Sequence, residues 1–231
     1  ASAAILSEYG HRVVVLEHGR IVDGSGMPAF RGDLAVKDGK IVEIGKITGA
    51  ATRTVDADGL AVSPGFIDNH CHYDAQVTWD PLCTFSPQHG ATTVIFGNCS
   101  LSLAPVRRGN EERMAEFLSY VEAIPMEVLR TVDVNWESFP QYMDRLSRMP
   151  LGINVSHLFP IAPAVAYVMG GFDEAKKRFP NEKEMSTIIG HFKEAMKVGA
   201  AGWSAQRLVP EGRVSVQRDY DGTPMITDIL P

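Results

Sequence analysis

Short runs in which apolar and polar residues alternate fill the first quarter of the chain, a pattern typical of half-buried strands. Asp38 and Gly39 separate two of these runs, and both residue types accept the positive φ that a two-residue hairpin turn requires. The predicted strands are residues 12–17, 33–37 and 40–44. We therefore expect a small β domain in residues 1–62.

After this segment, short apolar strands alternate with amphipathic helices, which is typical of a parallel sheet with crossover connections. The clearest helix spans about residues 182–198, because Asn181 and Glu184 match a capping box and Gly199 follows the last turn. Other helices are predicted to begin after Asn110, to cover residues 138–149 and to include residues 167–169. The predicted strands are residues 61–69, 92–96, 152–156 and 200–204.

Four strand and helix units are half of a (β/α)8 barrel, a fold of about 250 residues, and roughly 170 residues follow the β domain here. An open half would leave an unpaired strand edge and an exposed apolar face. The sequence therefore predicts an α/β fold in which residues 63–231 form the first half of a TIM-type barrel. A second polypeptide or a missing C-terminal half would complete it. A compact four-stranded α/β domain is the alternative.

Composition narrows the possible partners and the compartment. The chain has 231 residues, of which 45% are hydrophobic, and this is enough for a sizeable core. A formal net charge of −6 argues against a nucleic-acid partner, and no apolar run approaches the roughly 20 residues of a membrane span. The odd number of cysteines, Cys71, Cys83 and Cys99, favours reduced thiols, so we expect a cytoplasmic protein.

His70 and His72 are the first candidates for chemistry. They follow the apolar pair Phe66 and Ile67, where a strand would end, and barrel enzymes carry their catalytic groups at strand ends. In a strand, alternate side chains share one face, so the two imidazoles could hold one metal ion while Cys71 points away. Two ordinary histidines in a buried strand are the alternative.

The run from Pro64 to Asp74, Pro-Gly-Phe-Ile-Asp-x-His-x-His-x-Asp, resembles the first barrel strand of the amidohydrolase superfamily, the metal-dependent hydrolases related to urease and dihydroorotase. Residues 73–76, 79–81, 89–94 and 97–99 are similar, more narrowly, to the N-acyl-D-amino-acid deacylase (D-aminoacylase) branch. The resemblance extends from about residue 12 to the end of the chain. It implies that the first segment belongs to a β-sandwich, completed by strands from the far C-terminus.

The resemblance also implies a ligand set. In this branch a cysteine takes the metal-bridging place that a carboxylated lysine fills elsewhere, and Cys99 stands at that place. With His70 and His72 it gives three N and S ligands, for which Zn²⁺ is the default metal, as one or two ions. The implied general acid/base is an aspartate after the eighth strand, beyond residue 231, so the catalytic residue stays unassigned.

Three further residues are candidates for supporting roles. Asp74 follows His72 by two positions, where it could orient a ligand or cap a loop, and Asn98 precedes Cys99. Arg207 occupies a loop where the branch usually has a tyrosine that meets the substrate carboxylate, and it could hold a carboxylate itself or lie at the surface. His157 is predicted to be a satisfied polar residue. The residue pair 160–161, Pro-Ile, replaces the usual Gly-His.

These observations predict a metal-dependent hydrolase that cleaves a C–N amide bond of a small molecule, similar to N-acyl-amino-acid deacylases, with a metal-activated water as nucleophile. Cyclic-amide hydrolysis or deamination on the same scaffold is one alternative. A non-catalytic subunit that binds metal or a partner is another. A second polypeptide is the expected partner, and a homo-oligomer is left open.

Overall fold

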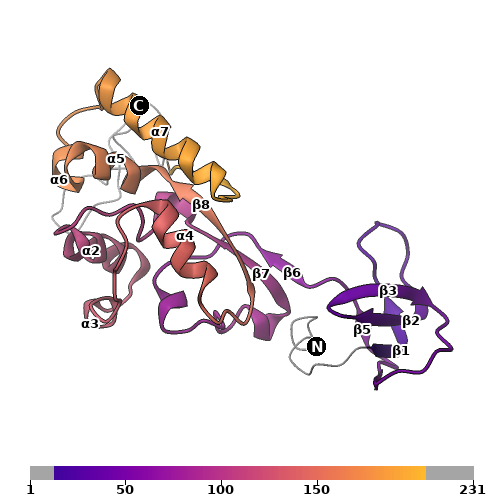
Figure 1. The fold of residues 1–231 in the computed structure, drawn as a ribbon. Helices are drawn as coiled ribbons and strands as arrows, with labels where there is room; N and C mark the ends of the chain where they lie inside the picture. The colour runs from indigo at the N-terminus through magenta and orange to yellow at the C-terminus, as the bar shows by residue number, and fades with distance from the viewer. Residues whose placement is uncertain (1–12, 207–231) are drawn as a thin grey trace. The chain divides into compact units, whose positions relative to one another are not determined.

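The computed structural model describes residues 13–206 (Figure 1). The chain divides into two compact units. The first comprises Ala1–Ile67 and Phe85–Thr93, and the second comprises Asp68–Thr84 and Val94–Pro231. No helix within the described residues is long and apolar enough to cross a membrane.

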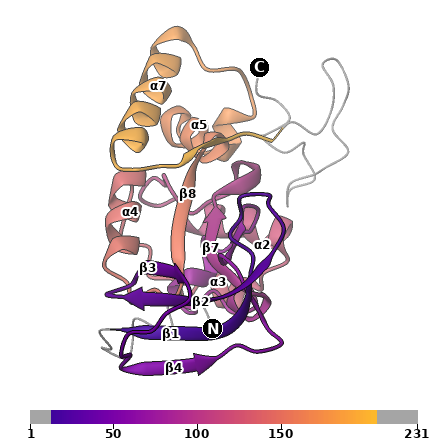
Figure 2. The ribbon, with the colours of Figure 1, turned by 90° about the vertical axis from the view of Figure 1, so that its right-hand side faces the viewer.

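The first unit contains a five-stranded sheet in which β1 is central (Figure 2). β2 pairs antiparallel with β1 and with β3, whereas β4 and β5 pair parallel with β1. Val14, Leu34 and Val36 form a buried apolar cluster on this sheet. The strands are β1 Val14–Ile21, β2 Phe30–Lys37, β3 Lys40–Gly45, β4 Arg53–Asp56 and β5 Ala61–Val62.

The predicted hairpin between β2 and β3 is confirmed. Asp38 and Gly39 have φ values of 49° and 74°, so both turn residues adopt the left-handed conformation that two-residue hairpins favour. β1 continues past the predicted end at residue 17, through an irregularity in its pairing between Leu16 and Gly19. The described residues show one sheet in this segment, and the β-sandwich stays a prediction.

The second sheet has the strand order β6-β7-β8-β9, which is also the order along the chain. β8 and β9 pair in parallel, with Leu158 opposite Gly202. α-helices separate β7 from β8 and β8 from β9, whereas only two 3-10 turns lie among the described residues between β6 and β7. Neighbouring strands that follow one another in the chain in this way are the arrangement of part of a (β/α)8 barrel. The strands are β6 Phe66–Asp68, β7 Ala91–Phe96, β8 Asn154–Pro160 and β9 Gly202–Ser204.

The predicted strand over residues 61–69 is wrong as a single element. β5 belongs to the first sheet and β6 to the second, and Pro64 and Gly65 lie between them. Proline has no N–H to donate to a strand ladder. A Cβ atom at Gly65 would lie 2.0 Å from the Thr92 side chain, so the backbone here approaches a neighbour too closely for any larger residue.

All four predicted helical regions are present, whereas the shortest elements were not predicted. Two four-residue helices and three 3-10 turns are too short to show a 3.6-residue period. The helices are α2 Glu111–Glu122, α3 Met126–Leu129, α4 Phe139–Ser147, α5 Ile161–Met169, α6 Phe172–Ala175 and α7 Glu182–Lys197. The 3-10 turns are η1 Gln76–Thr78, η2 Pro87–His89 and η3 Asn98–Ser100.

The predicted capping box of α7 is confirmed. The Glu184 amide donates to the Asn181 side chain at 2.9 Å, and the Asn181 amide donates to the Glu184 carboxylate at 2.8 Å. These bonds satisfy amides that would otherwise lack a partner at the helix start. Asn110 was also expected from its residue type to cap the start of α2, but it makes no side-chain capping bond, so this expectation is wrong.

We predict that Asn181→Ala lowers the free energy of unfolding by about 1 kcal/mol, because the start of α7 loses its side-chain acceptor. Urea denaturation followed by circular dichroism measures the change. Asn135→Ala is the control, since Asn135 is exposed and, within residues 13–206, its side chain bonds only to the nearby Asp133. Equal destabilisation by the two substitutions would contradict the role of the cap.

Candidate metal centre

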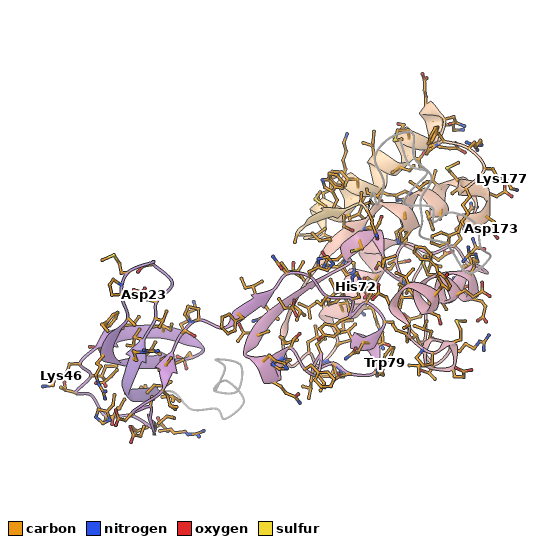
Figure 3. The ribbon with its side chains drawn as sticks, turned by 180° about the vertical axis from the view of Figure 1, so that it is seen from behind. Asp23, Lys46, His72, Trp79, Asp173 and Lys177 are labelled. Carbon is orange, nitrogen blue, oxygen red and sulfur yellow. The ribbon has the colours of Figure 1, made fainter. Side chains whose placement is uncertain are left out.

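The structure brings His70, His72 and Cys99 together. One potential ligand atom from each lies within 4.8 Å of the others, and this is the only such group found among the described residues. Nε2 of His70 is 3.2 Å from Sγ of Cys99, and the two imidazole rings have centroids 5.4 Å apart. His72 lies within the second unit (Figure 3), to which the other two residues also belong.

The histidines converge for a reason other than the predicted one. β6 ends at Asp68, so His70 and His72 lie in the irregular segment after the strand and not at alternate strand positions. The Asp68 carboxylate accepts a hydrogen bond from the His70 amide at 3.4 Å, at the point where the chain leaves the strand. The shape of this segment, and not strand alternation, makes the rings neighbours.

Cys99 lies in a strained turn directly after β7. Gly97, Cys99 and Ser100 have φ values of 78°, 53° and 62°. Left-handed conformations are unfavourable for residues with a Cβ atom, and they persist only where the surroundings impose them. Ser204, at the end of β9, supplies part of that constraint, because its hydroxyl donates to the Gly97 carbonyl and accepts from the Ser100 amide at 3.0 Å.

Asn98 ties this turn to the histidine segment. Its buried side-chain amide donates to the Ile95 carbonyl at 2.8 Å and to the Cys71 carbonyl at 3.4 Å. The Cys71 thiol also donates to Ile95, at 3.3 Å, and burial raises the pKa of this thiol to about 12. Cys71 therefore points away from His70 and His72 and stays protonated, while Asn98 fixes the spacing of the two segments.

Asp74 supports the cysteine turn and makes no hydrogen bond to His72. Its side chain is almost fully buried, and Oδ2 accepts from the Gly97 amide at 3.1 Å. Oδ1 lies 2.9 Å from Nε2 of His157, and the Tyr142 hydroxyl donates to the Asp74 carbonyl at 2.8 Å. Of the two predicted roles, the contacts match the cap of a loop, and that loop presents Cys99.

His157 is a fully buried residue that packs against the turn that presents Cys99. It has no exposed surface, and besides Asp74 its Nε2 lies 3.2 Å from the Ser102 hydroxyl, while Nδ1 lies 2.6 Å from the Leu158 carbonyl. A Cβ atom on Gly97 would lie 2.4 Å from Cε1 of His157. The prediction of a satisfied polar residue is confirmed, and His157 packs directly beneath the turn.

Glu122 was missed by the sequence analysis. It is the last residue of α2, and its Oε1 lies 3.6 Å from Nδ1 of His72. Burial raises the pKa of Glu122, and the charge of Asp74 adds to this effect. A glutamate at a helix end is common in sequences, so no local pattern could have singled it out.

Electrostatics at the three candidate ligands suit a cation. Burial lowers the pKa of His72, which favours the neutral imidazole that ligation requires. Burial raises the pKa of Cys99, and the Glu122 charge adds to it, so the thiolate needs a compensating positive charge. Nδ1 of His72 is buried and without a hydrogen-bond partner among the described residues. Two nitrogens and one sulfur fit zinc and leave a coordination position open.

Arg207 lies outside the described residues, so its predicted contact with a carboxylate stays a prediction.

A half-barrel with His and Cys side chains gathered after its first two strands combines a (β/α)8-type sheet with a candidate metal site at its strand ends. The comparison with protein families agrees, because the model described as "Amidohydrolase family" matches residues 53–171, slightly more than half of the chain. The chain belongs to the amidohydrolase family.

Relatives at the level of sequence and structure include deacylases. An uncharacterized protein of Mycobacterium tuberculosis is 36% identical over 202 residues, which are 83% of this chain and 32% of the relative. D-aminoacylase of Alcaligenes xylosoxydans xylosoxydans is 32% identical over 198 residues, 85% of this chain and 38% of the enzyme. The chain thus spans about a third of the length of these relatives.

A solved structure with a similar fold is N-acyl-D-glutamate deacylase of Bordetella bronchiseptica, in complex with zinc and a phosphonate inhibitor that mimics the tetrahedral reaction intermediate. The TM-score is 0.69 at 30% sequence identity, and the match covers 82% of this chain and 37% of the deacylase.

We predict that Gly97→Ala lowers the free energy of unfolding by about 2–4 kcal/mol, through backbone strain and a clash with His157. Gly109→Ala is the control. Gly109 also has positive φ, 87°, but a Cβ atom there would meet nothing within 4 Å, so only strain of about 1 kcal/mol is expected. Chemical denaturation compares the two variants, and equal losses would show that His157 does not support the turn.

Proposed function

We propose that this chain is the N-terminal part of a zinc-dependent hydrolase that cleaves the amide bond of small N-acylated amino acids. The observation that carries the proposal is the convergence of His70, His72 and Cys99 after β6 and β7. Membership of the amidohydrolase family supports amide hydrolysis, and the deacylases among the relatives support acylated amino acids as substrates.

In this proposal the chain supplies one side of the metal site. His70 and His72 would contribute neutral nitrogen donors, and Cys99 would contribute a thiolate that offsets the metal charge. A bound zinc ion would supply Lewis-acid polarisation of the amide carbonyl and activation of water. Asn98 and Asp74 hold the two ligand-bearing segments in register through their bonds to Cys71 and Gly97.

The general acid/base and the remaining ligands are proposed to come from the rest of the barrel. The chain covers 38% of D-aminoacylase and 37% of the Bordetella deacylase, so most of such an enzyme lies outside the sequence described here. The missing strands belong either to the same polypeptide or to a second one that completes the sheet. Turnover is expected only from the completed barrel.

We predict that the 231-residue chain binds Zn²⁺, and that alanine at His70, His72 or Cys99 weakens binding by about 100-fold or more, because each removes a direct ligand. Competition against a chromogenic chelator measures the affinity. His89→Ala is the control, since His89 is exposed and outside the cluster. Wild-type affinity in all three ligand variants would overturn the site assignment.

We predict that the completed barrel hydrolyses N-acyl amino acids, that a chelator abolishes this activity, and that Zn²⁺ restores it, because the Lewis acid acts on the scissile amide. Amino-acid release from a panel of N-acyl amino acids measures turnover. Five-membered and six-membered cyclic amides and aminopurines are assayed in parallel. Faster turnover of either alternative class would contradict the deacylase assignment while keeping the metal site.

A further inference from the structure

His72 has one ring nitrogen that lacks a hydrogen-bond partner. Nδ1 is buried and makes no hydrogen bond within the described residues 13–206. Leaving a buried polar atom without a hydrogen bond destabilises the folded state, so its persistence calls for an explanation. The acidic side chain that faces it is Glu122, whose Oε1 lies 3.6 Å away.

Glu122 is held in place by an ordered helix end. α2 is anchored through buried apolar residues, and the ring of one of these, Phe117, packs on Phe172 with centroids 4.7 Å apart. Directly after Glu122, Ala123 adopts φ of 53°, and the Ser119 hydroxyl donates to the Ile124 carbonyl at 2.6 Å. The carboxylate therefore reaches His72 from a defined position.

This position is unfavourable for a carboxylate by itself. The C-terminus of a helix carries partial negative charge, so an acid there is disfavoured, and Glu122 is only 21% exposed. Its one ion pair among the described residues is with His72. A neighbouring cation site would offset both costs.

We propose that Glu122 is a positioning residue of the metal centre, whose carboxylate accepts a hydrogen bond from Nδ1–H of His72. A neutral imidazole carries one N–H, so this bond leaves the Nε2 lone pair of His72 available for the metal. The inference rests on the proposed zinc function. The present separation of 3.6 Å exceeds a normal hydrogen bond by a few tenths of an ångström, a gap that a side-chain rotation closes.

Direct ligation by Glu122 is the competing arrangement. The group whose ligand atoms all lie within 4.8 Å of one another contains His70, His72 and Cys99 but not Glu122. Glu122 is therefore outside the group of candidate ligands. Removing a direct ligand and removing a positioning residue should weaken Zn²⁺ binding by different amounts.

The test uses the 231-residue chain with Zn²⁺ alone as the probe. Glu122→Ala is expected to weaken Zn²⁺ binding by about 10–100-fold, the effect usual for a group that orients a metal-ligating histidine. Glu122→Gln is expected to weaken it less, because the amide oxygen still accepts from Nδ1–H. Glu127→Ala removes an exposed carboxylate nearby and is expected to leave binding unchanged. Circular dichroism of each variant verifies folding.

A second readout needs no metal. In the metal-free chain labelled with ¹⁵N in its imidazoles, NMR is expected to show His72 as the Nδ1–H tautomer, with a shift towards Nε2–H in Glu122→Ala. An unchanged tautomer together with unchanged Zn²⁺ affinity overturns the role of Glu122. Loss of Zn²⁺ binding as severe as in Cys99→Ala makes Glu122 a ligand and overturns the positioning role. A wild-type chain that binds no Zn²⁺ overturns the proposed function, whereas the tautomer result still decides the pairing.

Discussion

The candidate site depends on the left-handed turn that presents Cys99. Two residues with side chains, Cys99 and Ser100, adopt φ values of 53° and 62° in sequence, which no local preference explains. The turn is held by two buried groups from other segments: Asp74 accepts from the Gly97 amide, and Ser204, at the end of β9, donates to the Gly97 carbonyl. The strain is thus offset by contacts from segments far apart in the chain.

The charges around the site form a second constraint. Burial raises the pKa of both Cys99 and Glu122 and lowers that of His72, so each group is held in its less charged form. A cation placed among them would favour the thiolate and the carboxylate and would leave the imidazole neutral. These directions agree with the proposed metal site, which itself rests on the geometry of the three side chains.

The sequence predicted local features well and contacts between distant parts of the chain less well. The hairpin at Asp38 and Gly39 and the capping box at Asn181 are written in two to four adjacent residues, so they could be recognised directly. His70, His72 and Cys99 were predicted as a cluster, although the strand that was meant to align the histidines ends at Asp68. Glu122 could not be found, because its neighbour His72 is fifty positions away and only the tertiary fold brings them together.

The end of β8 differs from the ends of β6 and β7, after which the candidate metal ligands lie. β8 passes into α5 without an intervening loop, since Pro160 ends the strand and Ile161 begins the helix. The Ala162 amide donates to the Ser100 hydroxyl at 2.6 Å, which binds the start of α5 to the cysteine turn. The resemblance to D-aminoacylases implies a Gly-His pair at this place, where the chain instead begins a helix that is almost entirely apolar. The start of α5 and the turn that presents Cys99 are therefore linked, so a change in one of these segments is transmitted to the other.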